Sequence, residues 1–264
     1  MRVGVCVKRV PSPGSRINVT DDALAVDAAK LGFTTSPHEE CAVEAAVQLV
    51  EAGGGEVVVI TLGPAEAAEQ LRTAASVGAT AFVLVEAADG CDWDPQRTAA
   101  ALATEIAALE ERDGTFDVLL FGNESADSGN FQVGVRVAHA LGRPIVNGVK
   151  GIELSAGGDG AAPALSARRE TDAGFEVYEL PLPCALGVKE GINLPRYPTM
   201  KGRLASRKAE IETAAAAGLA AEPGGQRRVR LHRPPEAASD TTVLGDSAAA
   251  APAVVDLLDE LGLL

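Results

Sequence analysis

The sequence has few aromatic residues, few histidines and no long apolar run. Phe, Trp and Tyr make up 3% of its 264 residues, although 47% of the chain is hydrophobic. The core must therefore be built from Val, Leu, Ile and Ala, which favours a parallel α/β fold over an aromatic-rich β-sandwich. Because no apolar run is long enough to cross a bilayer and no signal peptide precedes the first apolar segment, we expect a cytoplasmic protein with no membrane span.

The cysteines also form no recognisable motif. Cys6, Cys41, Cys91 and Cys184 form no CxxC pair, and none has a histidine at metal-ligand spacing. We expect free thiols in a reducing compartment and no metal site. Ser125 lies outside any GxSxG motif, and the three histidines have no catalytic partner at a recognisable spacing. The sequence therefore predicts no catalytic residue.

Positive charge is scarce as well. The chain has 23 Lys and Arg residues against 37 Asp and Glu residues, which gives a net charge of −14. Nucleic acid is not an expected partner, because its phosphates would be repelled. A small phosphorylated ligand would need a local group of backbone N–H donors to shield its charge.

The first 141 residues alternate between apolar runs and amphipathic segments. Continuous apolar runs predict buried strands at 2–7, 56–63, 81–86 and 117–122. Helical spacing of apolar residues predicts helices at 39–51, after Pro64, at 95–111 and at 130–141. Repeated strand–helix units with short connections predict a mostly parallel twisted sheet with helices on both faces.

The pattern changes after Pro144. The segments that follow are shorter, and FEVYEL alternates between apolar and polar residues. We expect an antiparallel extension of the sheet, built from short strands at 151–154, 164–170 and 175–182. A last buried strand is predicted at 184–189, and we place all these elements in one α/β domain spanning 1–209.

The remaining residues, 210–264, are expected to form a C-terminal arm. Residues 210–225 and 236–252 are biased in composition and weakly specified. Helical spacing of four apolar residues predicts a terminal helix at 253–263, with Val254, Leu257, Leu258 and Leu261 on one side. A helix this short is not stable alone in water, so its apolar stripe must pack on this domain or on another subunit.

Four segments converge at the carboxyl ends of the predicted parallel strands, where ligands of open α/β sheets bind. They are 7–9, 34–37, 62–64 and 122–134. The last is long, rich in small residues and leads into a predicted helix, whose N-terminus suits a phosphate. Within it, Gly129 allows close backbone approach, and Asp127 suits a helix cap or a ribose contact. Such loops often only cap a helix, and this one is neither a Walker loop nor GxGxxG, so the residues alone leave nucleotide binding open.

A cationic segment at 190–208 follows the last predicted strand. Pro195 and Pro198 stiffen it, and Met200 is an apolar residue close to several cations, Lys201, Arg203, Arg207 and Lys208. A methionine suits an adaptable anchor in the pocket of a partner, and the cations would steer it towards acidic surfaces. The alternative is a solvated basic turn whose methionine folds back onto the domain.

Four stretches resemble the beta subunits of electron transfer flavoproteins, in the order of that family. They are VCVKRVPSP (5–13), SPHEECAVEAA (36–46), TLGPAEAAEQLRTAASVGA (61–79) and GNESADSGNFQVG (122–134). The resemblance covers roughly residues 1–210. It implies an adenine-nucleotide-binding, alpha-hydrolase-like α/β fold. It also implies a structural AMP in this subunit and an FAD held mainly by the alpha subunit of a heterodimer.

The resemblance assigns the AMP contacts by position. They would be made by Val7, Ser36, Leu62, Asp127, Gly129, Asn130, Phe131, Gln132 and Val133. Many members of the family have Asn where this chain has Ser36, and Asn and Thr where it has Phe131 and Val133. Two potential phosphate donors are thus replaced by apolar groups, which leaves backbone N–H groups as the donors.

The resemblance further implies that segment 190–208 docks acyl-CoA dehydrogenase-like flavoprotein donors. Met200 takes the place of a leucine that enters the partner's pocket, and docking contacts are implied for Pro195, Arg196, Tyr197, Met200, Lys201 and Arg203. Glu170 matches a glutamate that contacts the mobile flavin domain of the alpha subunit. Phe175 and Tyr178 lie on opposite faces of one strand, and at least one is expected at the subunit contact or near the flavin. Electrons would pass on to a quinone oxidoreductase or a similar acceptor.

Two alternatives remain open. In the electron-bifurcating branch of the family a second FAD occupies the nucleotide pocket, and the loop tends to carry Gln-Val-Gly, as residues 132–134 do here. The other alternative is a stand-alone nucleotide-binding module resembling universal stress proteins, which would have no use for residues 169–208 or for the leucine-striped C-terminus. In each case we expect a carrier or binding function rather than bond chemistry.

Overall fold

The computed structural model describes residues 1–87, 93–155, 164–216, 225–235 and 241–264. These residues divide into two compact units, Met1–Leu231 and His232–Leu264. The first unit contains a nine-stranded sheet with the strand order β11-β5-β4-β1-β6-β10-β7-β8-β9. Cys91 and parts of both biased C-terminal stretches lie outside the described residues.

The parallel half of the sheet forms from the continuous apolar runs. Its strands are β1 (Arg2–Val7), β4 (Glu56–Gly63), β5 (Ala81–Glu86), β6 (Val118–Gly122) and β10 (Cys184–Val188). All neighbouring pairs among them run parallel. Nearly every residue of β1, β6 and β10 is buried, because helices cover both faces.

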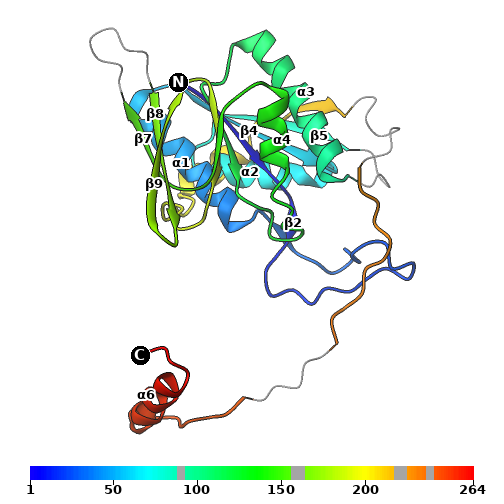
Figure 1. Ribbon diagram of the computed structural model, residues 1–264. Coiled ribbons are helices and arrows are strands. Elements are labelled where there is room, and N and C mark those ends of the chain that lie inside the picture. The colour runs from blue at the N-terminus through cyan, green and yellow to red at the C-terminus, as the bar shows by residue number, and fades with distance from the viewer. Residues whose placement is uncertain (88–92, 156–163, 217–224, 236–240) are drawn as a thin grey trace. The chain divides into compact units, whose positions relative to one another are not determined.

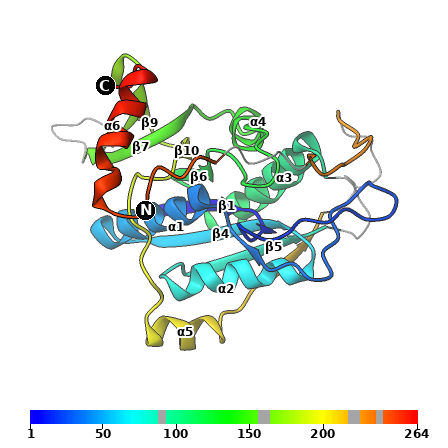
Figure 2. The ribbon, with the colours of Figure 1, turned by 90° about the horizontal axis from the view of Figure 1, so that it is seen from below.

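Two helices cover each face of the sheet. Helices α1 (Pro37–Gly53) and α2 (Ala68–Ser76) lie on one face, and α3 (Pro95–Asp113) and α4 (Val133–Ala140) lie on the other (Figure 2). A short 3-10 turn, η1 (Ala65–Ala67), precedes α2. Neighbouring residues of β4 point to opposite faces, so Val59 joins the core under α1 and α2 while Ile60 joins the core under α3 and α4. The mostly parallel α/β fold predicted from the sequence is confirmed.

The predicted antiparallel extension is also present, at one end of the sheet (Figure 1). It consists of β7 (Ile145–Ser155), β8 (Ala164–Thr171) and β9 (Gly174–Pro181). The first half of β7 pairs parallel with β10, and its second half pairs antiparallel with β8. The change of partner coincides with a register shift between Val149 and Gly151 and follows Gly148, whose φ is +72°.

The structure differs from the sequence predictions in two places. Residues 212–215 lie in a stretch expected to be weakly specified, yet they form β11 (Glu212–Ala215), which pairs parallel with β5. An ion pair of 2.6 Å between Arg112 Nη1 and Glu212 Oε1 fixes this strand to α3. The segment expected to be a recognition loop contains a helix, α5 (Met200–Ser206). Thr199 starts this helix because its Oγ1 accepts from the backbone N–H of Gly202 at 3.0 Å.

Shorter elements complete the two units. A small antiparallel pair, β2 (Val10–Pro11) with β3 (Phe33–Thr34), joins the chain after β1 to the chain before α1. The second unit contains a 3-10 turn, η2 (Ala248–Ala250), and α6 (Ala251–Glu260), close to the predicted terminal helix. The surface on which the apolar stripe of α6 packs stays a prediction.

The described residues also show the state of the cysteines and whether a metal cluster or a membrane-spanning helix is present. Cys6, Cys41 and Cys184 are buried as free thiols. Among the residues that the structure describes, no three His, Cys, Asp or Glu side chains are grouped so that they could hold a metal ion. No helix in the described part of the chain has both the length and the apolar character needed to cross a membrane.

Candidate functional site

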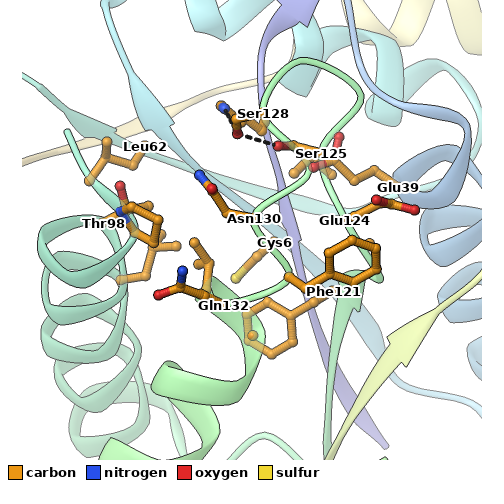
Figure 3. A pocket seen from close by; sticks show the side chains of 18 of the residues that line it. Cys6, Glu39, Leu62, Thr98, Phe121, Glu124, Ser125, Ser128, Asn130 and Gln132 are labelled. Carbon is orange, nitrogen blue, oxygen red and sulfur yellow. Dashed lines mark hydrogen bonds between the residues drawn. The ribbon is translucent and has the colours of Figure 1, made fainter. Parts of the chain in front are cut away.

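A cavity of about 400 Å³ opens at the carboxyl ends of β1, β4 and β6. Its walls come from the ends of these strands, the loop 122–134 after β6, the first turn of α1 and the start of α3. Leu62 and Thr98 lie on one side of it, Glu39 and Glu124 lie on the opposite side, and Asn130 lies between them (Figure 3). Its volume falls in the range of small-molecule sites, about 300–1,000 Å³.

Six of the nine residues that the resemblance assigned to AMP line this cavity. They are Val7, Leu62, Asn130, Phe131, Gln132 and Val133. The other three do not line it. Ser36 is fully buried as the N-cap of α1, Asp127 is paired with Lys8, and Gly129 is a turn residue with a φ of +54°. The contacts of all nine residues with a nucleotide stay predictions.

The first turn of α1 places a buried acid at the cavity. The Glu39 carboxylate turns back and accepts a hydrogen bond of 3.0 Å from the backbone N–H of Ser36, as the third residue of a capped helix often does. Its side chain is wedged against β6, since a Cβ atom added to Gly122 would lie 2.6 Å from Glu39 Cγ. Glu39 is therefore only 5% exposed although it lines the cavity.

Burial determines the charge of this acid. It raises the pKa of Glu39 from 4.5 to about 7, and the backbone N–H groups of Ser36 and Lys8 offset part of that effect. Glu124 lies on the same side of the cavity, with its Oε1 at 3.5 Å from His38 Nε2. This side of the cavity is acidic and does not suit a phosphate, whereas it suits the hydroxyl and amino groups of a sugar or a base.

Polar contacts within the loop 122–134 and with Lys8 fix the conformation of this loop. Lys8 Nζ bonds both carboxylate oxygens of Asp127 at 2.7 Å, which ties the loop to the end of β1. Ser125 and Ser128 share a hydrogen bond of 2.9 Å between their hydroxyls (Figure 3). Phe131 has a φ of +55°, a conformation that a bulky residue rarely adopts, and its ring is half-exposed at the cavity. Such local strain is typical of functional loops.

Sequence reasoning missed several residues that line the cavity. They include Cys6, Glu39, Trp93, Thr98, Phe121 and Asn147. Glu39 had a signal, because Ser36 and Glu39 have the spacing of a capping box and therefore place a carboxylate at the start of α1. The others come from strands, from the segment before α3 and from the first turn of α3, where the sequence pattern indicates burial but not the direction of a ligand.

The segment before α5 is attached along the side of α1. The backbone N–H of Glu190 donates to His38 Nδ1 at 2.8 Å, so the ring proton of His38 is on Nε2. One turn further along, Asn193 Nδ2 donates to the carbonyl oxygen of Cys41 at 3.0 Å. The same helix turn that borders the cavity at Glu39 therefore also holds the start of the docking candidate.

Arg196 completes this attachment. Its guanidinium donates to Glu44 at 2.8 and 3.0 Å and to Glu51 at 2.7 and 2.9 Å, and its backbone N–H also reaches Glu44 at 3.2 Å. The Glu44 side chain is only 5% exposed, so its charge needs these donors. Arg196 thus has a structural partner inside the chain, in addition to the docking contact that the resemblance implies for it.

The attached segment presents apolar side chains to solvent. Tyr197 is 91% exposed and Met200 is 74% exposed, and Leu194 and Leu204 are exposed beside them. Helix α5 rests closely on α2, because a Cβ atom added to Gly202 would lie 2.1 Å from the carbonyl oxygen of Ser76. Met200 is therefore not folded back into the core. Pro195 is half-buried, and Lys201 and Arg203 are exposed on α5.

The remaining candidates lie on the antiparallel extension. Glu170 forms an ion pair of 2.8 Å with Lys150, which lowers the pKa of its carboxyl. Phe175 is exposed, with the Arg168 guanidinium 5.0 Å from its ring centroid. Tyr178 packs against the core, and its hydroxyl donates to Glu176 at 2.9 Å. Of the two aromatic residues, Phe175 is the one left open to a partner, and the subunit contact itself stays a prediction.

Comparison with known proteins gives consistent matches. The family described as electron transfer flavoprotein domain matches residues 23–219. The electron transfer flavoprotein subunit beta of Syntrophomonas wolfei is 36% identical over 82% of this chain and 81% of the relative. The same subunit of Bacillus subtilis is 29% identical over 80% of this chain and 78% of the relative. Protein FixA of Azorhizobium caulinodans is 31% identical over 80% of this chain and 74% of the relative.

We predict that Glu39 makes stability depend on pH. The pKa of its carboxyl is about 7 in the folded chain and 4.5 when exposed, so between these values the folded state holds a proton that the unfolded state has lost. Stability therefore falls as pH rises through this window, by roughly 3 kcal/mol at most. In Glu39→Gln this loss should disappear, so that urea unfolding shows the variant gaining stability relative to the wild type from pH 5 to pH 8.

The exposed residue Glu69 on α2 provides the matched control. Glu69→Gln should shift the unfolding free energy equally at both pH values. If Glu39→Gln and Glu69→Gln show the same pH profile, the burial of a proton-binding carboxyl at the cavity is contradicted.

We also predict that Arg196 and Glu44 stabilise the chain jointly. Arg196→Met leaves a buried carboxylate without its main donors, which should cost about 1–3 kcal/mol of unfolding free energy. Adding Glu44→Gln should recover most of that loss in a double-mutant cycle. Hydrogen exchange of the amides at 190–199 should rise in Arg196→Met. Additive effects of the two substitutions would contradict the attachment of this segment to α1.

Proposed function

The chain belongs to the electron transfer flavoprotein family, in the group of beta subunits and FixA proteins, and from this premise we propose how it takes part in electron transfer. We propose that it pairs with an FAD-bearing alpha subunit, holds an adenine nucleotide in the cavity, and docks flavoprotein dehydrogenases with the segment around Met200. The observation that carries the proposal is the cavity itself, which brings together the strand ends, the loop 122–134 and the first turn of α1.

The cavity suits an adenosine monophosphate unit. Its volume of about 400 Å³ is near the lower end for small-molecule sites, which fits a mononucleotide or one half of a dinucleotide. Leu62 and Phe121 offer apolar surface for a base, and Asn130 offers an amide between the two sides. The acidic side at Glu39 and Glu124, opposite Leu62, favours the hydroxyl groups of the sugar over a phosphate. The resemblance implies AMP, and its alternative, a second FAD, contains the same unit.

The exposed apolar segment suits a docking role. Met200 stands at the start of α5, and the attachment of residues 190–196 to α1 limits the conformational entropy that docking would cost. Lys201 and Arg203 follow it directly on the same helix, so an acidic rim around a hydrophobic pocket is the complementary surface. Acyl-CoA dehydrogenase-like flavoproteins are the proposed electron donors, and a quinone oxidoreductase or a similar protein is the proposed electron acceptor.

The alpha subunit is the proposed holder of the FAD. Glu170 and the exposed Phe175 lie on the β8–β9 extension, and we propose that this extension faces the alpha subunit and its flavin domain. The chain needs no catalytic residue of its own for this role, because the flavin performs the redox chemistry and the protein positions it. Membership of the family favours this subunit role over a stand-alone nucleotide-binding module.

The nucleotide proposal predicts a second adenine compound in the purified complex of this chain with its alpha subunit. Acid release followed by mass identification should yield an adenine nucleotide in addition to the FAD of the alpha subunit. AMP with one FAD per heterodimer indicates the ordinary form, and two FAD molecules indicate the bifurcating form. If no adenine nucleotide accompanies the first FAD, the proposal is wrong.

Two substitutions to tryptophan control this experiment. Leu62→Trp fills the cavity and should release the second nucleotide while the FAD of the alpha subunit remains bound. Ala52→Trp places the same side chain at an exposed position near the C-terminal end of α1, away from the cavity, and should leave both ligands in place.

The docking proposal predicts that Met200→Ala slows electron delivery from a reduced cognate dehydrogenase. A buried methionine side chain contributes about 1.5–3 kcal/mol, so its loss should weaken docking roughly ten- to a hundredfold. Stopped-flow reduction of the flavin measures the effect. Met200→Leu keeps the apolar bulk and should transfer electrons nearly as fast as the wild type. Equal rates for Met200→Ala and the wild type, with equal flavin content, would rule out this anchor.

A further inference from the structure

A second cavity, of about 910 Å³, adjoins the first beside the start of α3. The two cavities share six lining residues, namely Lys8, Arg9, Trp93, Pro95, Ser128 and Asn130. A ligand in the first cavity would therefore lie beside residues that also line the second. Residues 225–231 contribute part of the lining of this second cavity. The proposed function gives these residues no role.

The charged residues that line the second cavity include more cations than carboxylates. Its charged side chains are four cations, Lys8, Arg9, Arg227 and Arg228, and two carboxylates, Asp94 and Asp127. Both carboxylates already accept hydrogen bonds. Asp94 accepts from the backbone N–H groups of Arg97 and Gln226, each at 2.8 Å, and Asp127 accepts from Lys8 at 2.7 Å. In a chain with a net charge of −14, this is a local excess of positive charge.

Backbone contacts hold the arginines at the cavity. The segment 225–231 is fastened at one end by the bond from Gln226 to Asp94 and at the other by the backbone N–H of Leu231, which donates to the carbonyl oxygen of Ala23 at 2.7 Å. Between these points, Arg228 Nη1 donates to the carbonyl oxygen of Leu24 at 2.8 Å. The segment that carries Arg227 and Arg228 is therefore held beside the cavity by hydrogen bonds to Asp94, Leu24 and Ala23.

Arg9 is positioned in a similar way. Its guanidinium lies 3.4 Å from the ring centroid of Phe33, and its buried Nε atom has no hydrogen-bond partner in the described structure. Neither Arg9 nor Arg227 forms an ion pair within the part of the chain that the structure describes. Guanidinium groups are well suited to bind phosphate oxygens through paired N–H donors.

The two cavities differ in the charged residues that they do not share. Lys8 and Arg9 line both cavities, while Arg227 and Arg228 line only the second. The carboxylates of Glu39 and Glu124 line only the first cavity. Phosphates that extend from the first cavity into the second would therefore move away from these two carboxylates and towards an excess of cations.

We propose that the second cavity is a phosphate subsite in which Arg9, Arg227 and Arg228 bind the second phosphate of a nucleoside diphosphate group. This inference rests on the proposed nucleotide site and narrows its ligand from a monophosphate to a diphosphate. Such a group occurs in ADP and also in a dinucleotide such as FAD. The relative affinities of the complex for ADP and FAD distinguish these two sources.

The test compares AMP, ADP and FAD as ligands of the complex of this full chain with its alpha subunit, freed of its second nucleotide. Calorimetric titration should show that ADP binds at least about tenfold more tightly than AMP, because guanidinium–phosphate contacts are charge-assisted. In Arg227→Gln/Arg228→Gln the preference for ADP should fall to about twofold or less, with AMP affinity kept within about twofold. Arg227→Gln alone should give an intermediate preference.

The control is Arg230→Gln, which removes the same charge from an exposed position on the same segment outside the lining. It should keep the wild-type preference. Tighter binding of FAD than ADP, lost in the double variant, identifies a dinucleotide as the source of the diphosphate, and weaker binding of FAD identifies a free nucleotide.

Equal affinity of the wild type for AMP and ADP overturns this inference and leaves the nucleotide proposal standing. An equal loss of AMP and ADP binding in the double variant also overturns this inference, because the arginines would then stabilise the fold and not bind the second phosphate. Absence of binding of all three ligands overturns both proposals.

Discussion

The parallel pairing of β1 with β4 and with β6 is the constraint on which the site depends. Residues 3–6 of β1 are in register with both neighbours, so the three strands end at one edge of the sheet. Helices cover both faces, which leaves this edge as the place where strand ends and helix starts meet a ligand. The same edge explains why residue 122 is a glycine. Gly122 ends β6 directly against Glu39, and a Cβ atom at this position would collide with the Glu39 side chain, which borders the cavity.

Helix α1 connects the cavity to the docking segment. Its first turn contributes Glu39 to the cavity, and the same helix holds the chain before α5 through His38, Cys41, Glu44 and Glu51. Because one helix carries both sets of contacts, packing rather than a flexible loop fixes the segment before Met200 relative to the cavity. Under the proposed function, this attachment would hold a docked donor at a fixed place on the chain.

The sequence predicted the parallel sheet well because burial on both faces leaves long apolar runs at β1, β4, β5 and β6. It failed at β11, because the residues Glu-Thr-Ala-Ala carry no strand pattern and pair only where β5 offers an edge and Arg112 offers a charge. It placed six of nine proposed nucleotide contacts at the cavity but missed Glu39, whose role depends on a helix cap meeting a glycine across the fold. It did not predict the ion pair of Arg196 with Glu44, because no sequence pattern brings these residues together, and the docking contact of Arg196 stays a prediction.

The arginines show why net charge says little about the ligands of this chain. Arg2, Arg112, Arg143 and Arg196 each form ion pairs within the fold, so neighbouring carboxylates offset their charge. Two groups of other cations lie in different settings. Lys201 and Arg203 stand on an exposed helix, where physiological salt screens charges beyond about 8 Å, so they chiefly affect the rate of encounter with a partner. Arg9, Arg227 and Arg228 line a cavity, Arg9 half-buried and the other two exposed, so a phosphate in that cavity would lie close to all three charges. A chain with a net charge of −14 can thus carry a local group of cations that its overall charge does not reveal.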